Sequence, residues 1–146
     1  MRKQLLGWAA LPLVGYAAIS AWLFAKQRDL IYLPQGTHVD ASQTDFVLPR
    51  DDVQLHGWVL NPQGGQPVIY FGGNAESVQN RREQLGRVLP GRAIYLVSYR
   101  GYGASGGKPS EEALLGDALA LFDTVRARHP GEPVAVVGSS LGGGVA

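Results

Sequence analysis

The sequence predicts an α/β fold in which helices cover a mostly parallel sheet. Three short apolar runs, at residues 68–71, 93–97 and 134–137, are typical of strands that are buried on both faces. Two longer segments lie between them, at residues 76–88 and 110–128, and the second repeats apolar residues at helical spacing. Alternating strands and helices indicate parallel strands joined by right-handed crossovers.

Two further strands are expected before the first apolar run. Residues 46–48 and 54–60 are predicted to form an antiparallel hairpin that turns around Asp51 and Asp52. Further along, Ser110 is followed by two acidic residues, a pattern typical of the first turn of a helix. We therefore expect the longer helix to begin at Ser110.

Composition excludes several classes of function. The formal net charge is +1, with 13 basic and 12 acidic residues, so no nucleic-acid partner is expected. The chain has no cysteine, which excludes disulfides, zinc thiolate sites and a cysteine nucleophile. No metal ion and no cofactor is predicted.

The N-terminal segment predicts a membrane anchor over residues 1–28. Leu5 to Ala25 are 21 residues without a charge, and as a helix they would span roughly the 30 Å of a hydrocarbon core. Trp8 and Trp22 suit the two headgroup zones. A cleaved signal peptide is the alternative, because the chain begins with basic residues. The expected partner is the lipid bilayer, with a single span and the folded domain outside the cytoplasm.

The remaining chain divides into a connector and one domain. Residues 29–45 lack a sustained period and contain Pro34 and Gly36, so they are predicted to be a juxtamembrane connector. Residues 46–146 hold all the predicted strands and both later helices. They are expected to form the domain.

A Gly-x-Ser-x-Gly motif, Gly138–Gly142, directly follows the last predicted strand. In this motif small residues let a strand turn sharply into a helix and leave the central serine, here Ser140, exposed and strained. A second match surrounds Ser105, but its neighbours have the composition of a loop. Ser140 is therefore the candidate nucleophile. A glycine-rich turn that binds phosphate is the alternative.

Three segments together resemble the α/β hydrolases, in particular the branch with one N-terminal membrane helix. Tyr70–Ala75, Ser98–Gly103 and Gly138–Gly142 occur in the order and spacing seen in that family. The resemblance extends from Asp29 to the last residue. It implies the α/β-hydrolase fold, with a mostly parallel sheet and helices on both faces. It also implies a serine hydrolase that acts on small-molecule esters, thioesters or amides through an acyl-serine intermediate.

The resemblance also implies roles for individual residues. Ser140 would be the nucleophile, and the backbone N–H groups of Leu141 and Asn74 would bind the oxyanion. Family members commonly read His-Gly-Asn-Ala-Gly in the loop where this chain has Gly72–Glu76. The chain is therefore expected to lack a histidine that would brace this loop.

The other catalytic residues are not expected within this chain. In this fold the acid and the histidine follow the nucleophile, whereas all three histidines of the chain precede Ser140. The sequence is therefore expected to be the N-terminal part of a hydrolase domain, truncated after the nucleophile elbow and inactive by itself. A noncatalytic membrane-anchored interaction module, or a relic of a hydrolase fold, is the alternative. His38, His56 and His129 are expected at the surface or in turns. Asp117 and Asp123 are expected on the solvated face of the helix at residues 110–128.

Overall fold

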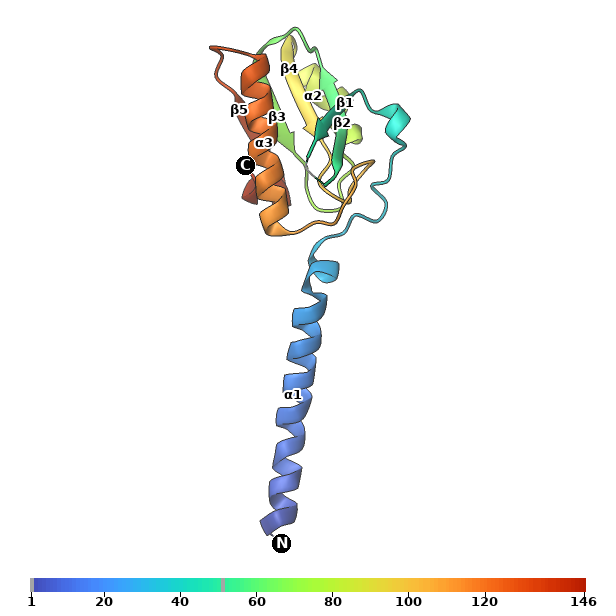
Figure 1. Ribbon diagram of the computed structural model, residues 1–146, viewed down its shortest axis with the longest axis vertical. Helices are drawn as coiled ribbons and strands as arrows, with labels where there is room; N and C mark the ends of the chain where they lie inside the picture. The colour runs from blue at the N-terminus through green and yellow to red at the C-terminus, as the bar shows by residue number, and fades with distance from the viewer. Residues whose placement is uncertain (1, 51) are drawn as a thin grey trace. The chain divides into compact units, whose positions relative to one another are not determined.

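A computed structural model describes residues 2–50 and 52–146, with side chains from residue 11 onward (Figure 1). The chain separates into two compact units, Met1–Tyr32 and Leu33–Ala146. The first unit contains helix α1 (Arg2–Ile31). The second unit contains all the strands and both later helices.

Helix α1 forms over the segment predicted to be a membrane anchor. No helix in the described part of the chain, however, combines the length and the apolar character needed to cross a lipid bilayer. The uncharged run with described side chains is residues 11–25, and its 15 residues give a helix of about 22 Å. Residues 5–10 of the predicted anchor have side chains that lie outside the described residues. The structure therefore does not support the predicted transmembrane helix.

The second unit is built on a mixed sheet of five strands in the order β1-β2-β4-β3-β5. Strand β3 pairs in parallel with both β4 and β5, whereas β2 pairs antiparallel with both β1 and β4. All five predicted strands are present, and Asp51 of the predicted hairpin turn lies outside the described residues. The strands are β1 (Phe46–Pro49), β2 (Gln54–Leu60), β3 (Gly65–Phe71), β4 (Arg92–Val97) and β5 (Ala135–Gly138).

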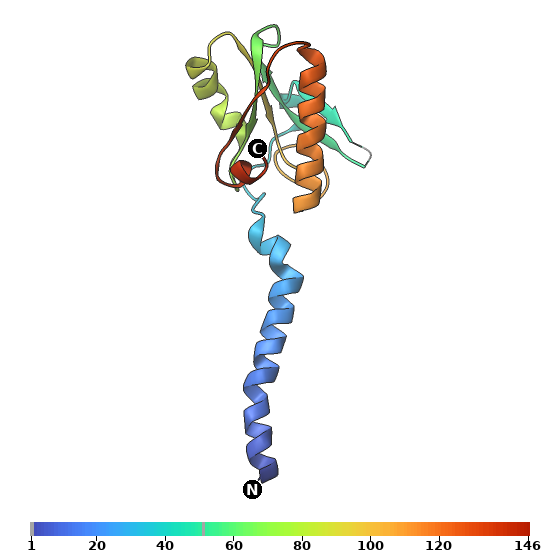
Figure 2. The same cartoon turned by 90° about the vertical axis from the view of Figure 1, so that its left-hand side faces the viewer.

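Helices cover both faces of this sheet, as predicted. Helix α2 (Arg82–Val88) lies on one face and α3 (Glu111–Arg128) on the other (Figure 2). The helix predicted from residue 76 starts later, because residues 73–76 form a turn and η2 (Val78–Arg81) is a 3₁₀ helix. Two further 3₁₀ turns are η1 (Ala41–Gln43) and η3 (Ser140–Gly144).

The core consists of apolar residues from the central strands and the inner faces of the helices. Alternate residues of β3 and β4 gather on one face, because side chains along a strand point in alternate directions. That cluster comprises Val39, Trp58, Val68, Tyr70, Val78, Ile94 and Leu96, with Leu85 of α2 packed against it. On α3, Leu114, Ala118, Leu121 and Val125 are buried at helical spacing. The central strands are thus covered on both faces.

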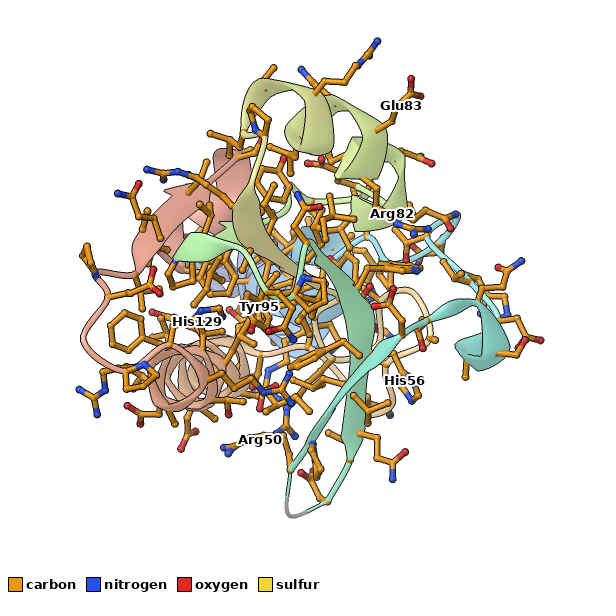
Figure 3. The ribbon with its side chains drawn as sticks, turned by 90° about the horizontal axis from the view of Figure 1, so that it is seen from above. Arg50, His56, Arg82, Glu83, Tyr95 and His129 are labelled. Carbon is orange, nitrogen blue, oxygen red and sulfur yellow. The ribbon has the colours of Figure 1, made fainter. Side chains whose placement is uncertain are left out.

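Two residues of the predicted set are buried. His129 lies in the turn after α3, one of the two positions expected for it, whereas the solvated position expected for Asp117 is wrong. His129 is 7% exposed, and its Nε2 lies 3.0 Å from the hydroxyl of Tyr95 on β4 (Figure 3). Asp117 is 5% exposed and pairs with Arg50 and Arg100. Asp123 is exposed and pairs with Arg126 within α3, as expected of a solvated helix face.

Ser110 caps the N-terminus of α3, as predicted. Its hydroxyl oxygen accepts a hydrogen bond from the N–H of Ala113 at 3.3 Å. Ser110→Ala should lower the free energy of unfolding by about 1 kcal/mol, because one N–H of the first turn loses its acceptor. Urea denaturation measures this difference, and Ser110→Asp, which retains an acceptor, should match the wild type. A Ser110→Ala variant as stable as the wild type would show that the cap contributes nothing.

Candidate active site

The Gly-x-Ser-x-Gly segment forms a sharp turn from strand to helix. Strand β5 ends at Gly138, and η3 begins at Ser140. The φ angle of Ser140 is +49°, a left-handed conformation that residues other than glycine seldom adopt. Strained backbone of this kind is concentrated at functional sites and is a feature of the nucleophile elbow. The turn therefore has the geometry that the motif predicts.

Both glycines of the motif are required by close backbone contacts. A Cβ atom on Gly138 would overlap the carbonyl group of Gly142, and one on Gly142 would overlap the carbonyl oxygen of Phe71. The N–H of Ser139 also donates to the Phe71 carbonyl oxygen at 3.0 Å. The elbow is thus pressed against the carboxyl end of β3.

The loop after β3 is supported by the second motif of the sequence. The Tyr99 hydroxyl donates to the Gly72 carbonyl oxygen at 2.8 Å, and the Tyr102 hydroxyl donates to Asn74 Oδ1 at 2.7 Å. Asn74 Oδ1 also accepts from the N–H of Leu33 at 3.0 Å. The role of Ser98–Gly103 is therefore to support the loop that carries Asn74.

The loop after β3 also lies beside the elbow. A Cβ atom on Gly73 would be 3.6 Å from the carbonyl oxygen of Ser139 and 3.7 Å from its Oγ. Leu141 lies in the first turn of η3, where N–H groups have no acceptor within the helix. The structure thus brings together the three segments that the sequence analysis singled out.

Glu76 is a residue of this loop whose importance the sequence analysis missed. Its Oε2 accepts from the N–H of Gly73 at 2.6 Å, and its Oε1 accepts from the Tyr70 hydroxyl at 2.9 Å and from Arg81 Nε at 2.6 Å. Burial would raise the pKa of Glu76, but the hydrogen bonds from Arg81, Gly73 and Tyr70 hold it below its usual range. The carboxylate is therefore charged at neutral pH. In the sequence, Glu76 is indistinguishable from a residue that opens a helix.

Ser105, the central residue of the second Gly-x-Ser-x-Gly match, is buried and its hydroxyl is hydrogen-bonded to the backbone. Ser105 is only 8% exposed. Its hydroxyl donates to the carbonyl oxygen of Ser98 at 2.9 Å and accepts from the N–H of His56 at 2.9 Å. These bonds attach the loop to the end of β2 and β4. Among the two serines, Ser140 alone lies at a strand-to-helix turn.

Two of the three histidines have partners other than Ser140. His56 Nδ1 lies 3.1 Å from Thr44 Oγ1, and His129 is bonded to Tyr95. Figure 3 shows His56 on the hairpin and His129 beside α3. Within the described residues, no hydrogen bond or ion pair joins Ser140 to a histidine or an acidic side chain.

A strained serine between a buried strand and a helix, next to a glycine-rich loop after another strand, defines the class of α/β hydrolases. A family model described as serine aminopeptidase, S33, matches residues 67–146, and the chain belongs to this family of α/β hydrolases. The family predicted from the three motifs is thereby confirmed.

Known relatives extend this likeness over most of the chain. The lysophosphatidylserine lipase ABHD12 of Xenopus tropicalis is 43% identical over a region that covers 77% of this chain and 35% of the lipase. The α/β-hydrolase domain-containing protein WAV2 of Arabidopsis thaliana is 35% identical over a region that covers 86% of this chain and 47% of WAV2.

The fold also matches solved structures. An α/β hydrolase from Vibrio vulnificus superimposes with a TM-score of 0.60 at 26% identity, over 68% of this chain and 36% of that protein. The chain thus spans less than half the length of these two relatives and of this structure. The predicted α/β-hydrolase fold is confirmed.

Proposed function

We propose that Ser140 is the nucleophile of a serine hydrolase that cleaves ester, thioester or amide bonds. The observation that carries the proposal is the left-handed backbone of Ser140 after the end of β5, in a turn whose Ser139 lies beside the loop after β3. Family membership supports a hydrolase, and one relative is named as a lipase. A small-molecule acyl compound is the proposed substrate.

The proposed reaction has two steps. Ser140 Oγ attacks the carbonyl carbon and its proton passes to a base, while the carbonyl oxygen becomes an oxyanion. The N–H groups of Leu141 and Asn74 donate to this oxyanion. The leaving alcohol, thiol or amine departs with a proton, and water then hydrolyses the acyl-serine to release the acid and restore Ser140.

We propose that the base is a histidine that follows Ser140 in a longer protein of which this chain is a part, called the full-length gene product below. In this fold the partners come in the order serine, acid, histidine, and the histidines within this chain precede Ser140. Without a base the serine hydroxyl stays protonated and reacts slowly, and loss of a triad member lowers the rate by several powers of ten. We therefore expect residues 1–146 alone to show almost no turnover.

Labelling with a fluorophosphonate probe tests the assignment of the nucleophile. The full-length gene product should be labelled, Ser140→Ala should abolish labelling, and Ser105→Ala should retain it. Ser105→Ala leaves the His56 N–H and the Ser98 carbonyl without this partner, so it should also lower stability by about 1–3 kcal/mol.

Two outcomes would contradict the proposal. Labelling that survives Ser140→Ala would place the nucleophile elsewhere. A folded wild-type protein that no fluorophosphonate labels would favour the noncatalytic relic instead. Thermal unfolding of each variant shows that the compared proteins are folded.

A further inference from the structure

We infer that Glu76 is a positioning residue that holds the oxyanion loop in its working conformation. The inference rests on the proposed function of Ser140 and Asn74. It concerns a residue that makes no contact with the reacting atoms in the proposed reaction. Glu76 would act through the backbone of Gly73 and Asn74.

Glu76 fixes the peptide groups on both sides of Gly73. Its carboxylate accepts from the N–H of Gly73 at 2.6 Å, and its own N–H donates to the Gly73 carbonyl oxygen at 3.2 Å. The peptide between Gly73 and Asn74 is planar, so the direction of the Gly73 carbonyl also determines the direction of the Asn74 N–H. Glu76 therefore sets the orientation of the proposed oxyanion donor.

The turn needs this support because its backbone is strained. Ala75 has a φ angle of +57°, in the left-handed region where alanine is less stable than glycine. Gly72 and Gly73 precede it, and glycines give the loop additional conformational freedom. The backbone bond from the Glu76 N–H remains in any variant at this position, so the carboxylate bond to the Gly73 N–H is the one that a substitution removes. Without it, we expect the loop to relax into other conformations in which the Asn74 N–H points elsewhere.

The carboxylate is itself held on its outer side. Glu76 Oε1 accepts from Tyr70 on β3 and from Arg81 on η2. The Glu76 side chain is 15% exposed and that of Arg81 is 43% exposed, so the pair lies at the edge of the core. Glu76 thus ties the loop to the strand before it and the helix after it. Glu76 thereby braces the loop in which family members commonly have a histidine and this chain has Gly72.

A positioning role predicts a larger effect on the transition state than on substrate binding. With p-nitrophenyl butyrate as substrate, Glu76→Ala should lower kcat of the full-length product by roughly 10- to 100-fold, because a misdirected oxyanion donor stabilises the transition state poorly. KM should change by less than about twofold. Glu76→Gln keeps an acceptor but loses the charge, so its loss of kcat should be smaller.

A boronic acid reports on the same site without turnover. Phenylboronic acid forms a tetrahedral adduct with a serine nucleophile and so resembles the intermediate. Its inhibition constant should rise in Glu76→Ala by about the same factor as kcat falls. A merely structural role of Glu76 would change kcat and KM together and would not produce this correspondence.

Glu83→Gln is the matched control for the loss of one acidic side chain. Glu83 lies seven residues further along, is 83% exposed and pairs with Arg87 at 3.7 Å. Its kcat, KM and inhibition constant should equal those of the wild type. Thermal unfolding of all variants identifies any that are not folded, and Glu76→Gln keeps the test possible if Glu76→Ala is among them.

The results separate failure of this inference from failure of the proposed function. If the wild type hydrolyses the ester in a Ser140-dependent manner and folded Glu76→Ala or Glu76→Gln has unchanged kcat and boronate affinity, Glu76 has no positioning role. Equal changes in kcat and KM would overturn the inference too. If the folded wild type shows no Ser140-dependent reaction, the proposed function fails and the inference fails with it.

Discussion

Gly142→Ala is expected to disrupt the elbow. The added Cβ would overlap the carbonyl oxygen of Phe71, and neither group is a flexible side-chain end that could move away. The turn must shift, and the bond from the Ser139 N–H to Phe71 weakens. We expect stability to fall by about 1–3 kcal/mol and labelling of Ser140 to slow by about 100-fold, because displacement of a nucleophile by about 1 Å has effects of this size.

Gly143→Ala is the matched control for this prediction. A Cβ atom at Gly143 would meet no atom within 4 Å, although the residue adjoins Gly142 in the same turn. Denaturation midpoints and fluorophosphonate labelling rates measured on both variants give the comparison. Equal behaviour of Gly142→Ala and Gly143→Ala would contradict the close contact between the elbow and β3.

Asp117→Ala is expected to cause a large loss of stability in the domain. The carboxylate of Asp117 accepts from Arg50 Nε at 2.9 Å and from Arg100 at 2.6 and 2.9 Å. The pKa of Arg100 is raised above its usual value, chiefly by the hydrogen bond to Asp117. Removing the carboxylate leaves two guanidinium groups without their shared partner, so we expect a loss of about 3–5 kcal/mol.

Asp123→Ala controls for the loss of an acidic residue from the same helix. Asp123 is 66% exposed and pairs with Arg126 three residues away. An exposed pair of this kind contributes little, so the free energy of unfolding should change by less than about 0.5 kcal/mol. Urea denaturation compares the two variants. If both lose the same stability, the buried network does not stabilise the domain as described.

The strands could be predicted from the sequence because their local pattern reflects burial. Parallel strands are covered on both faces, so runs such as Val68–Phe71 are apolar throughout. Helix α3 was similarly visible, because the buried Leu114, Leu121 and Val125 repeat at helical spacing and Ser110 caps the first turn. In each case the signal lies within one element.

Burial that depends on distant partners could not be predicted. Asp117 has the local surroundings of a solvated helix face, but its partners Arg50 and Arg100 are 67 and 17 residues away. His129 likewise appears in the sequence as a residue of a turn, and its buried partner Tyr95 is 34 residues away. A pattern within one segment contains no information about such pairs.

The candidate site, too, could be predicted from the sequence only in part. The strained backbone at Ser140 was predictable because the motif and the preceding strand are contiguous. Glu76 was not, because its importance comes from contacts with Tyr70 and Arg81 in a loop that was expected to begin a helix. The fold was needed to show that this residue faces the backbone of Gly73.

Mapping the fluorophosphonate adduct by mass spectrometry tests the assignment of Ser140 most directly. Trypsin cleaves after Arg100, Arg126 and Arg128, so Ser105 and Ser140 fall in different peptides. In a protein that contains this chain together with the proposed histidine base, the added mass should lie in the peptide that begins at His129, with fragment ions locating it at Ser140. An adduct in the peptide that contains Ser105, or on any residue other than Ser140, would contradict the account.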